Sequence, residues 1–362
     1  MEYTQQEKYW IWLSSIEGMT ARKFYKILVS AGDAQNVYEQ PRSFKPLFDD
    51  KLFGALLASM NNGSPEGMLE QLEKNKVCAV TRINDLYPES LMHISDPPAT
   101  LYVKGDPDLN CDKALAIVGT RRASYDGKKA AKEFSTLLSE NGVTVISGLA
   151  RGIDTIAHTS CLDAGGHTVA VLGNGLGSVY PPENEALAQR IVDSGGSVVS
   201  EMEMSQKPSK WSFPMRNRII AGLSRGVLVV EGDRKSGSLI TAQLGLEEGR
   251  DIFAIPGSIY NSLSEGPNSL IQNGAYMALS PWDILESMRW GTRPNLRQKQ
   301  NKAPELDENE KKIYDLLKSG AMSFDEIENV TQMTTSELNS CLTMLTLRSI
   351  IIKLPGNLYR LS

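Results

Sequence analysis

Basic, glycine and hydroxyl residues recur just after short apolar segments in the middle of this 362-residue chain. The sequences GTRRAS, SGLARG, FPMRNR and DRKSGS begin at Gly119, Ser147, Phe213 and Asp233. Glycine lets a ligand approach the backbone closely, helix N-termini offer unpaired N–H groups, and arginine pairs with phosphate oxygens. This combination predicts a site for a phosphate-bearing ligand.

The segment SFPMRNRIIAGLSRG, residues 212–226, predicts a short amphipathic helix with two arginines in its opening turn. Cations are disfavoured at that end of a helix because the helix dipole is positive there. We therefore expect Arg216 and Arg218 to have phosphate partners, and their removal to weaken binding without changing thermal stability. The alternative is that both arginines stabilise the fold through buried carboxylates such as Glu201 or Glu231.

Other phosphate-binding and nucleophilic motifs do not fit the spacing. The first turn, GTRRASYDG, is not GxGxxG, and no acidic residue follows the next apolar segment as a ribose partner, so a dinucleotide oxidoreductase is not expected. GDRKSGSL, residues 232–239, has P-loop glycine spacing but lacks the Lys-Ser/Thr pair. No GxSxG elbow surrounds a serine.

Histidine and cysteine spacing offers no catalytic or metal site. His93, His158 and His167 have no partner at suitable spacing. The four cysteines are far apart and form no CxxC pair, which is typical of reduced thiols in a cytoplasmic protein. We expect no catalytic residue, no metal and no cofactor.

A repeat of apolar runs and helical patterns, from about residue 113, must position the basic segments. The runs are ALAIVG, VTVISG, TVAVLG, SVVSEM, GVLVVEG and DIFAIPG. Continuous apolar strands are buried on both faces, which indicates a parallel sheet covered by helices. The fold class is α/β, an extended Rossmann-like doubly wound parallel sheet, whose ligands bind beyond the carboxyl ends of the strands.

Three domains are expected. Residues 1–80 have helical periodicity, and their SSIEGMTARK turn, with Thr20 as N-cap, resembles a SAM or helix-hairpin-helix unit, the alternative being a plain helical bundle. The sheet domain covers 81–285, including a proline-rich bridging segment at 81–112, and 286–306 is a linker. Residues 307–362, three helical segments and two short strands, match a winged helix.

Composition narrows the possible partners. Hydrophobic residues make up 41% and charged residues 22% of the chain, as in soluble globular proteins. No apolar run is long enough to cross a bilayer, and no signal peptide is visible, so we expect a cytoplasmic protein without a membrane partner. The net charge of −5 means that a nucleic acid would require a local positive site.

The segments VGTRRAS, VISGLARGIDTIAH, AVLGNGLGSVYPPEN, SFPMRNRIIAGLS, VVEGDRKSGSLITAQ and FAIPGS together resemble the DNA-processing protein A (DprA/Smf) family. The resemblance implies a protein that binds single-stranded DNA without catalysis. It implies protection of incoming strands in natural transformation, or competence, and loading of the RecA recombinase for DNA recombination. It also implies a homodimer.

The resemblance further implies which residues act. The DNA-binding residues would be Gly119, Thr120, Arg121, Ser147, Gly148, Leu149, Ala150, Arg151, Phe213, Arg216, Asn217, Arg218, Ile219, Lys235, Ser236, Gly237 and Ser238. The dimer and recombinase-facing surface would include Leu246, Leu270, Ile271, Gln272 and Met277. Some relatives have a basic residue where this chain has Pro182-Glu183, so no phosphate contact is expected there.

Two alternatives belong to other classes. The sheet also resembles nucleotide phosphoribohydrolases, but their PGGxGT motif is absent and Glu231 stands at the strand end in EGDRKSGSLIT. In the other alternative the winged helix is the DNA-binding module. Residues 307–362 hold six basic and eight acidic residues, a net charge of −2, which favours a regulatory or protein-contact role instead.

Overall fold

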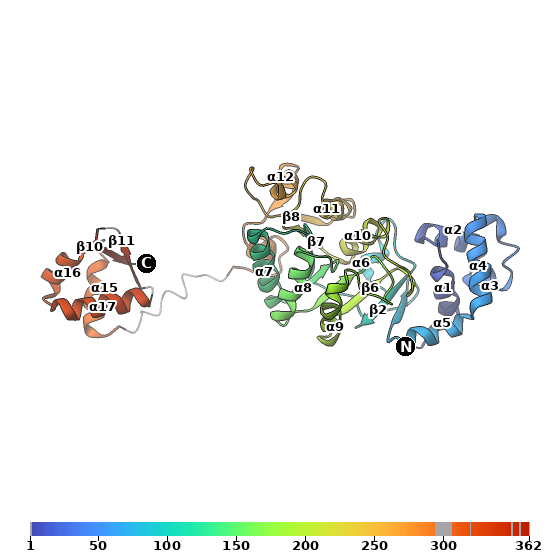
Figure 1. The fold of residues 1–362 in the computed structure, drawn as a ribbon, viewed down its shortest axis with the longest axis horizontal. Helices are drawn as coiled ribbons and strands as arrows, with labels where there is room; N and C mark the ends of the chain where they lie inside the picture. Colours follow the sequence, from blue (N-terminus) through green and yellow to red (C-terminus); the bar gives the residue numbers. More distant parts are fainter. Residues whose placement is uncertain (1, 294–305, 319, 349, 355, 362) are drawn as a thin grey trace. The chain divides into compact units, whose positions relative to one another are not determined.

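The structure is a computed structural model, and it describes residues 2–293, 306–318, 320–348, 350–354 and 356–361. The chain forms two compact units, Met1–Thr292 and Arg293–Ser362 (Figure 1), and each is described by itself. Among the described helices, none combines the length and the apolar character needed to cross a membrane.

A nine-stranded sheet is the framework of the first unit, with the order β1-β2-β6-β5-β4-β3-β7-β8-β9. Strands β3 to β9 are mutually parallel, while β1 and β2 are antiparallel additions at one edge. The bounds are β1 (Cys78–Thr81), β2 (Thr100–Gly105), β3 (Ala114–Val118), β4 (Thr144–Ser147), β5 (Thr168–Val171), β6 (Ser197–Ser200), β7 (Gly226–Val229), β8 (Asp251–Ala254) and β9 (Tyr276–Met277).

Helices cover both faces of this sheet, and strand β3 shows why its sequence is apolar throughout. Ala114, Ala116 and Val118 pack into one core with α6 (Glu89–Met92), α10 (Ser212–Leu223) and α11 (Gly237–Glu247). Leu115 and Ile117 point the other way, into a core with α7 (Tyr125–Glu140), α8 (Ile153–Asp163) and α13 (Pro281–Ser287). Successive side chains of a strand alternate between faces, so two covered faces require a continuous apolar run. The predicted doubly wound α/β fold is confirmed.

Two further helices complete the sheet region, α9 (Glu185–Asp193) and α12 (Glu265–Gln272). The bridging segment is more ordered than a loop, because it supplies α6 and β2. Helix α13 ends at Ser287, inside the expected linker, and residues 294–305 of that linker lie outside the described residues. The expected domain boundaries stay a prediction.

The N-terminal region is helical, as predicted. It consists of α1 (Gln5–Ser15), α2 (Ala21–Ala31), α3 (Ala34–Glu39), α4 (Asp50–Asn62) and α5 (Pro65–Lys74). The turn between α1 and α2 has Gly18 at φ 84°, in the region that favours glycine. The Thr20 side chain accepts a hydrogen bond from Lys23 N at 3.3 Å, which confirms Thr20 as the N-cap of α2.

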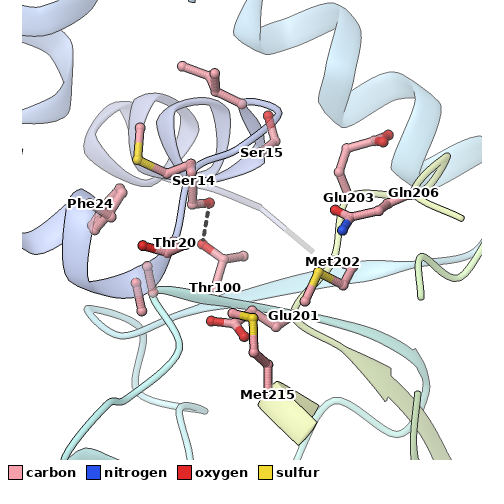
Figure 2. Close-up of a pocket in the computed structure, with 14 residues that line it drawn as sticks. Ser14, Ser15, Thr20, Phe24, Thr100, Glu201, Met202, Glu203, Gln206 and Met215 are labelled. Atoms are coloured by element: carbon pink, nitrogen blue, oxygen red, sulfur yellow. Dashed lines mark hydrogen bonds between the residues drawn. The ribbon is translucent and has the colours of Figure 1, made fainter. Parts of the chain in front are cut away.

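Hydrogen bonds and apolar contacts join these helices to the antiparallel edge of the sheet. Trp10 Nε1 donates to Ala99 O at 2.7 Å, and the Ser14 and Thr100 hydroxyls are 2.8 Å apart (Figure 2). Tyr3 Oη accepts a hydrogen bond from Ala79 N of the outermost strand, β1, at 2.8 Å. A small cavity of about 40 Å³ remains between the α1–α2 turn and the segment that follows β6 (Figure 2).

The second unit has the winged-helix arrangement that the sequence predicts. Helices α15 (Glu308–Leu317), α16 (Phe324–Thr331) and α17 (Thr335–Leu347) enclose an apolar core with the strands. The strands β10 (Met322–Ser323), β11 (Ile351–Leu354) and β12 (Leu358–Leu361) form a sheet in the order β10-β12-β11. The short strand β10 was not among the predicted elements.

Candidate nucleic-acid interface

A groove of about 700 Å³ lies beyond the carboxyl ends of β3, β4 and β7. Strands β3 and β7 are neighbours, but the chain continues from them toward opposite edges of the sheet. Such a reversal of strand order opens a crevice where ligands of doubly wound sheets bind. The lining includes Gly119, Thr120, Arg121, Ala150, Asp154, Tyr180, Lys210, Phe213, Arg216, Asn217, Ser236, Gly237 and Ser238.

Helix α10 supplies one wall of the groove, and its start differs from the expected one. The helix begins at Ser212, so Arg216 and Arg218 lie in its second turn, and the expectation of two arginines in the opening turn is wrong. The helix is also buried on nearly every side from Arg216 to Leu223. It packs against α11, α6 and strands of the sheet, which leaves no solvated face for a surface arginine.

Arg216 is a structural part of the groove floor. Its side chain is buried, and Nη1 donates to Gly148 O at 2.7 Å and to Val171 O. Burial lowers the Arg216 pKa to about 10, opposed by the charge of Asp154. Gly148 is required beneath the guanidinium, since a Cβ at that position would lie 2.4 Å from Nη1. Arg216 therefore brings its charge to the floor while holding the ends of β4 and β5 together.

Asp154 organises the loop after β4, and sequence reasoning missed it. Its carboxylate accepts hydrogen bonds from Gly148 N at 3.1 Å and Ala150 N at 3.4 Å. Burial raises the Asp154 pKa to about 6, although Arg216 and these bonds act in the opposite direction. The amides of Gly148 and Ala150, two of the residues expected to bind DNA, thus already have an acceptor. The available signal was the acidic residue in the first turn of a helix, the preferred place for a carboxylate.

Two other residues of this loop point away from the groove. Ser147 is fully buried, and its hydroxyl donates to Ile117 O at 2.7 Å. The Leu149 side chain is fully buried in the core beside α9, with the backbone at φ 54°. Both residues shape the loop from below, so neither side chain faces a ligand in the groove.

An aromatic and cationic stack forms the mouth of the groove. The guanidinium carbon of Arg121, an exposed side chain, lies 5.5 Å from the centroid of the Phe213 ring. The Tyr180 ring packs on Phe213 at 5.7 Å with an interplanar angle of 42°. A Cβ at Gly173 would lie 2.9 Å from the Phe213 ring, so glycine there makes room for the stack. Sequence reasoning missed Tyr180, although it is the aromatic residue of the loop that follows β5.

Known proteins share this architecture. Residues 78–289 match the family DNA recombination-mediator protein A, and residues 297–357 match the DprA winged helix domain. The chain belongs to this family. Protein Smf of Escherichia coli is 43% identical over 228 residues, which cover 63% of this chain and 61% of that protein. DNA processing protein DprA of Streptococcus pneumoniae is 46% identical over 59% of this chain and 75% of that protein.

Solved structures of the family superpose on the chain. The structure of DprA from S. pneumoniae matches with a TM-score of 0.67 and 36% identity, covering 79% of this chain and 98% of that one. DNA processing protein A from Helicobacter pylori matches with a TM-score of 0.54 and 30% identity, covering 59% and 96%. The H. pylori structure is described in terms of a single-stranded DNA binding mode.

In this member of the family, the rim of the groove carries exposed charges. Arg151 pairs with Glu183, its Nη2 lying 3.1 Å from Oε2, so the acidic residue expected to lack a phosphate contact neutralises a neighbouring arginine. Lys235 is exposed in the loop before α11. Ser236 caps α11 by accepting a hydrogen bond from Ser238 N, and a Cβ added to Gly237, which lies between them, would have open space around it.

Arg218 and Ile219 do not line the groove. Arg218 Nη2 donates to both oxygens of Glu201 at 2.7 and 2.8 Å, and Nε lies 3.2 Å from an oxygen of Asp96. The opposing carboxylates raise the Arg218 pKa against the effect of burial. Ile219 is part of the core between α10 and the sheet. The alternative, in which Arg218 pairs with a buried carboxylate such as Glu201, is therefore the arrangement found. This arrangement does not support the expectation that Arg218 can be removed without a change in thermal stability.

Glu231 has a structural position as well. It is buried at the end of β7 and accepts hydrogen bonds from Ser124 N at 2.9 Å and Ser124 Oγ at 2.5 Å. Gly127 lies against the carboxylate, because a Cβ there would be 2.1 Å from Oε2. The carboxylate thereby anchors the first turn of α7. Glu231 thus has a structural contact that accounts for its position at the end of β7.

The residues expected at a dimer or recombinase surface lie on α11, α12 and β9. Leu246 and Met277 are exposed, at 61% and 50%. Gln272 is exposed and Ile271 is half-buried, whereas Leu270 packs against the core. Exposed apolar side chains are therefore present where the family resemblance places this surface.

Proposed function

We propose that this protein binds single-stranded DNA in the groove, without base preference and without cleaving it. The observation that carries the proposal is the stack of Arg121 on Phe213, with Tyr180 packed on the same ring. An exposed guanidinium can pair with a backbone phosphate, and an aromatic ring can support a base of any type. The H. pylori relative, described as binding single-stranded DNA, supports the same ligand.

The groove suits a phosphate backbone better than a nucleotide substrate. Arg216 places a positive charge at the floor, while Arg121, Lys210 and Lys235 bring charge to the lining and the nearby rim. Sequence-independent binding depends on such charges, because phosphates that they neutralise release counterions. Because the whole chain has a net charge of −5, this attraction depends on a local concentration of positive charge such as that in the groove.

In the cell, this activity would protect incoming strands and help load the RecA recombinase during natural transformation and recombination. The chain would act as a homodimer through the surface of Leu246, Ile271 and Met277. Two copies of the groove in one assembly would hold one strand at two places, which raises the overall affinity. Replacing Ile271 by Glu should yield a folded monomer in light scattering and remove cooperativity from DNA binding. A wild type that is monomeric at micromolar concentration would contradict the homodimer.

The decisive experiment compares a labelled oligo-dT with a duplex of equal length in fluorescence anisotropy across a range of salt. We expect tighter binding to the single strand and a slope of log K against log salt of about −0.7 per neutralised phosphate. A flat salt response or a preference for duplex would refute the groove as a phosphate site. Hydrolysis of nucleoside monophosphates that is lost in Glu231→Gln would favour the phosphoribohydrolase alternative.

A further inference from the structure

Trp211 is an exposed aromatic residue beside the groove, and it is not one of the residues that the sequence predicts to bind DNA. Its side chain is 81% exposed, and it lies two residues before Phe213, whose ring lines the groove. The preceding residue, Lys210, also lines the groove. Trp211 thus stands at the point where the chain enters α10 from the groove wall.

Two serines hold the backbone on both sides of Lys210 and Trp211. Ser212 N donates to Ser209 Oγ at 3.1 Å, and Ser209 N donates to Ser212 Oγ at 3.1 Å. The Ser212 hydroxyl also donates to Ser209 O at 3.0 Å, and Ser212 is buried. This serine clamp, Ser209 with Ser212, fixes the two residues between them in a tight turn. A side chain presented by a fixed backbone loses less conformational entropy on binding.

The surrounding sequence has the charge pattern of a strand-binding surface. From Ser205 to Met215 the chain carries Lys207 and Lys210, both exposed, and no acidic residue. Lysines interleaved with aromatic rings are the combination that tracks a single strand, with charge for phosphates and rings for bases. An isolated exposed apolar side chain needs no explanation, but a clamped tryptophan between lysines at a groove is a different arrangement.

We propose that Trp211 is a second base-stacking platform, which extends the path of a single strand from Phe213 out of the groove along the Lys207–Trp211 segment. The proposal rests on single-stranded DNA binding in the groove. The ligand is a nucleobase of any type, because stacking uses the face of the base and not its hydrogen-bonding edge. Lys207 and Lys210 would neutralise the phosphates on either side of that base.

Tryptophan fluorescence tests the proposal directly. The chain has five tryptophans, of which Trp10 and Trp12 are buried and Trp282 and Trp290 half-buried, so a neutral quencher such as acrylamide acts mainly on Trp211. Saturating oligo-dT should quench this emission and shield it from acrylamide. Trp211→Phe should remove the signal but keep most of the affinity, since a phenyl ring still stacks.

Affinity measurements separate stacking from charge. Trp211→Ala should bind oligo-dT roughly 5- to 150-fold more weakly with an unchanged salt slope, because the lost interaction is not ionic. Lys210→Gln should instead make the slope shallower by about 0.7. Both side chains are exposed, so circular dichroism and melting should match the wild type and exclude a folding defect.

The possible failures are distinguishable. If wild-type protein binds oligo-dT but its accessible emission does not change and Trp211→Ala binds equally well, the platform is refuted and the groove remains. A Trp211→Ala variant that keeps its DNA affinity but no longer self-associates would identify Trp211 as a protein contact and overturn the proposal. Wild-type protein that does not bind oligo-dT at all would refute the proposed function, and the platform with it.

Discussion

Arg218 and Glu201 form a buried, two-pronged ion pair in which one guanidinium nitrogen, Nη2, lies 2.7 and 2.8 Å from the two carboxylate oxygens. Their side chains are only 9% and 14% exposed. Asp96 contacts the same guanidinium and also lies 3.6 Å from Arg22 of α2. The pair therefore belongs to a charge network that links α10, the segment after β6 and the N-terminal helices.

The first prediction is that Arg218→Ala destabilises the fold. Removing one partner of a buried ion pair leaves a carboxylate without compensation, which costs about 3–5 kcal/mol. Urea denaturation should show this loss as a lower midpoint with an unchanged slope. Arg22→Ala is the matched control, because this side chain is 83% exposed and an exposed pair contributes little. The double variant Arg218→Met with Glu201→Leu should recover much of the stability, because it removes both charges of the pair. Equal stability of Arg218→Ala and wild type would contradict the prediction.

The second prediction concerns Arg121, which is exposed and stacked on Phe213. Arg121→Ala should leave the melting temperature unchanged, bind oligo-dT about tenfold more weakly and make the salt slope shallower by about 0.7. Arg121→Lys keeps the charge but not the planar stack, so its slope should equal that of the wild type while its affinity falls. An Arg121→Ala variant with the wild-type slope would show that this arginine does not pair with a phosphate.

The third prediction compares two glycines of the candidate site. Gly148→Ala would place a Cβ 2.4 Å from the Arg216 guanidinium, which would have to give up its hydrogen bonds to Gly148 O and Val171 O in order to move. We expect a loss of about 1–3 kcal/mol in the free energy of unfolding, and weaker DNA binding as Arg216 shifts. Gly237→Ala is the control, since nothing lies within 4 Å of the added carbon and alanine favours the helix that begins there. Equal effects of the two substitutions, measured by denaturation, would contradict the assigned role of Gly148.

The fourth prediction is that His158 and Asp154 have opposite effects on stability as pH changes. Burial lowers the His158 pKa to about 3, so between about pH 6.5 and pH 3 only the unfolded chain is protonated there and stability falls as pH falls. Burial raises the Asp154 pKa to about 6, so between about pH 4 and pH 6 only the folded chain is protonated there and stability falls as pH rises. The two contributions oppose each other between pH 4 and 6.

Each substitution should reveal the other group. Between pH 4 and 6, the slope of the free energy of unfolding against pH should be more negative in His158→Gln than in wild type, by about 1.4 kcal/mol per pH unit. The reason is that only the Asp154 contribution, which falls as pH rises, remains. In Asp154→Asn the same slope should be more positive than in wild type by a similar amount, because only the His158 contribution remains. His93→Gln is the control, because that side chain is exposed. Denaturant titrations at four pH values test this, and parallel pH profiles for all variants would refute both shifts.

The parallel sheet could be predicted from the sequence because a strand that is buried on both faces has a continuous run of apolar residues. The run from Ala114 to Val118 is apolar at every position for the reason seen in its two cores. The N-cap of α2 was readable for a similar reason, because Thr20 acts on a residue only three positions away. Strand β1 was missed, since its register depends on β2, whose paired residues are 19 to 25 positions further along the chain.

The location of the candidate site could be predicted from the sequence, but the role of every residue in it could not. Glycines and basic residues after the strands indicate the correct edge of the sheet. Nothing local shows that Arg218 turns toward Glu201 and Asp96 while Arg216, two residues earlier, turns toward the groove. That difference arises because a helix has 3.6 residues per turn, so side chains two positions apart point to different faces. The helix also begins earlier in the sequence than expected. Asp154 and Tyr180 were missed because their importance depends on contacts with distant segments.

The hydrogen bond from Ala79 N to the Tyr3 hydroxyl restricts how copies of this chain can add to one another. A strand that approached β1 would find this N–H already satisfied, so the antiparallel edge is a poor template for pairing. At the opposite edge, β9 is two residues long and its Tyr276 and Met277 side chains are exposed. Of the two edges, β9 is therefore the better one for pairing with a second copy, and a reciprocal contact of β9 with β9 would be complete with two copies. Head-to-tail addition of β9 onto β1, the arrangement that would propagate into filaments, would have to displace the Tyr3 hydroxyl from Ala79 N.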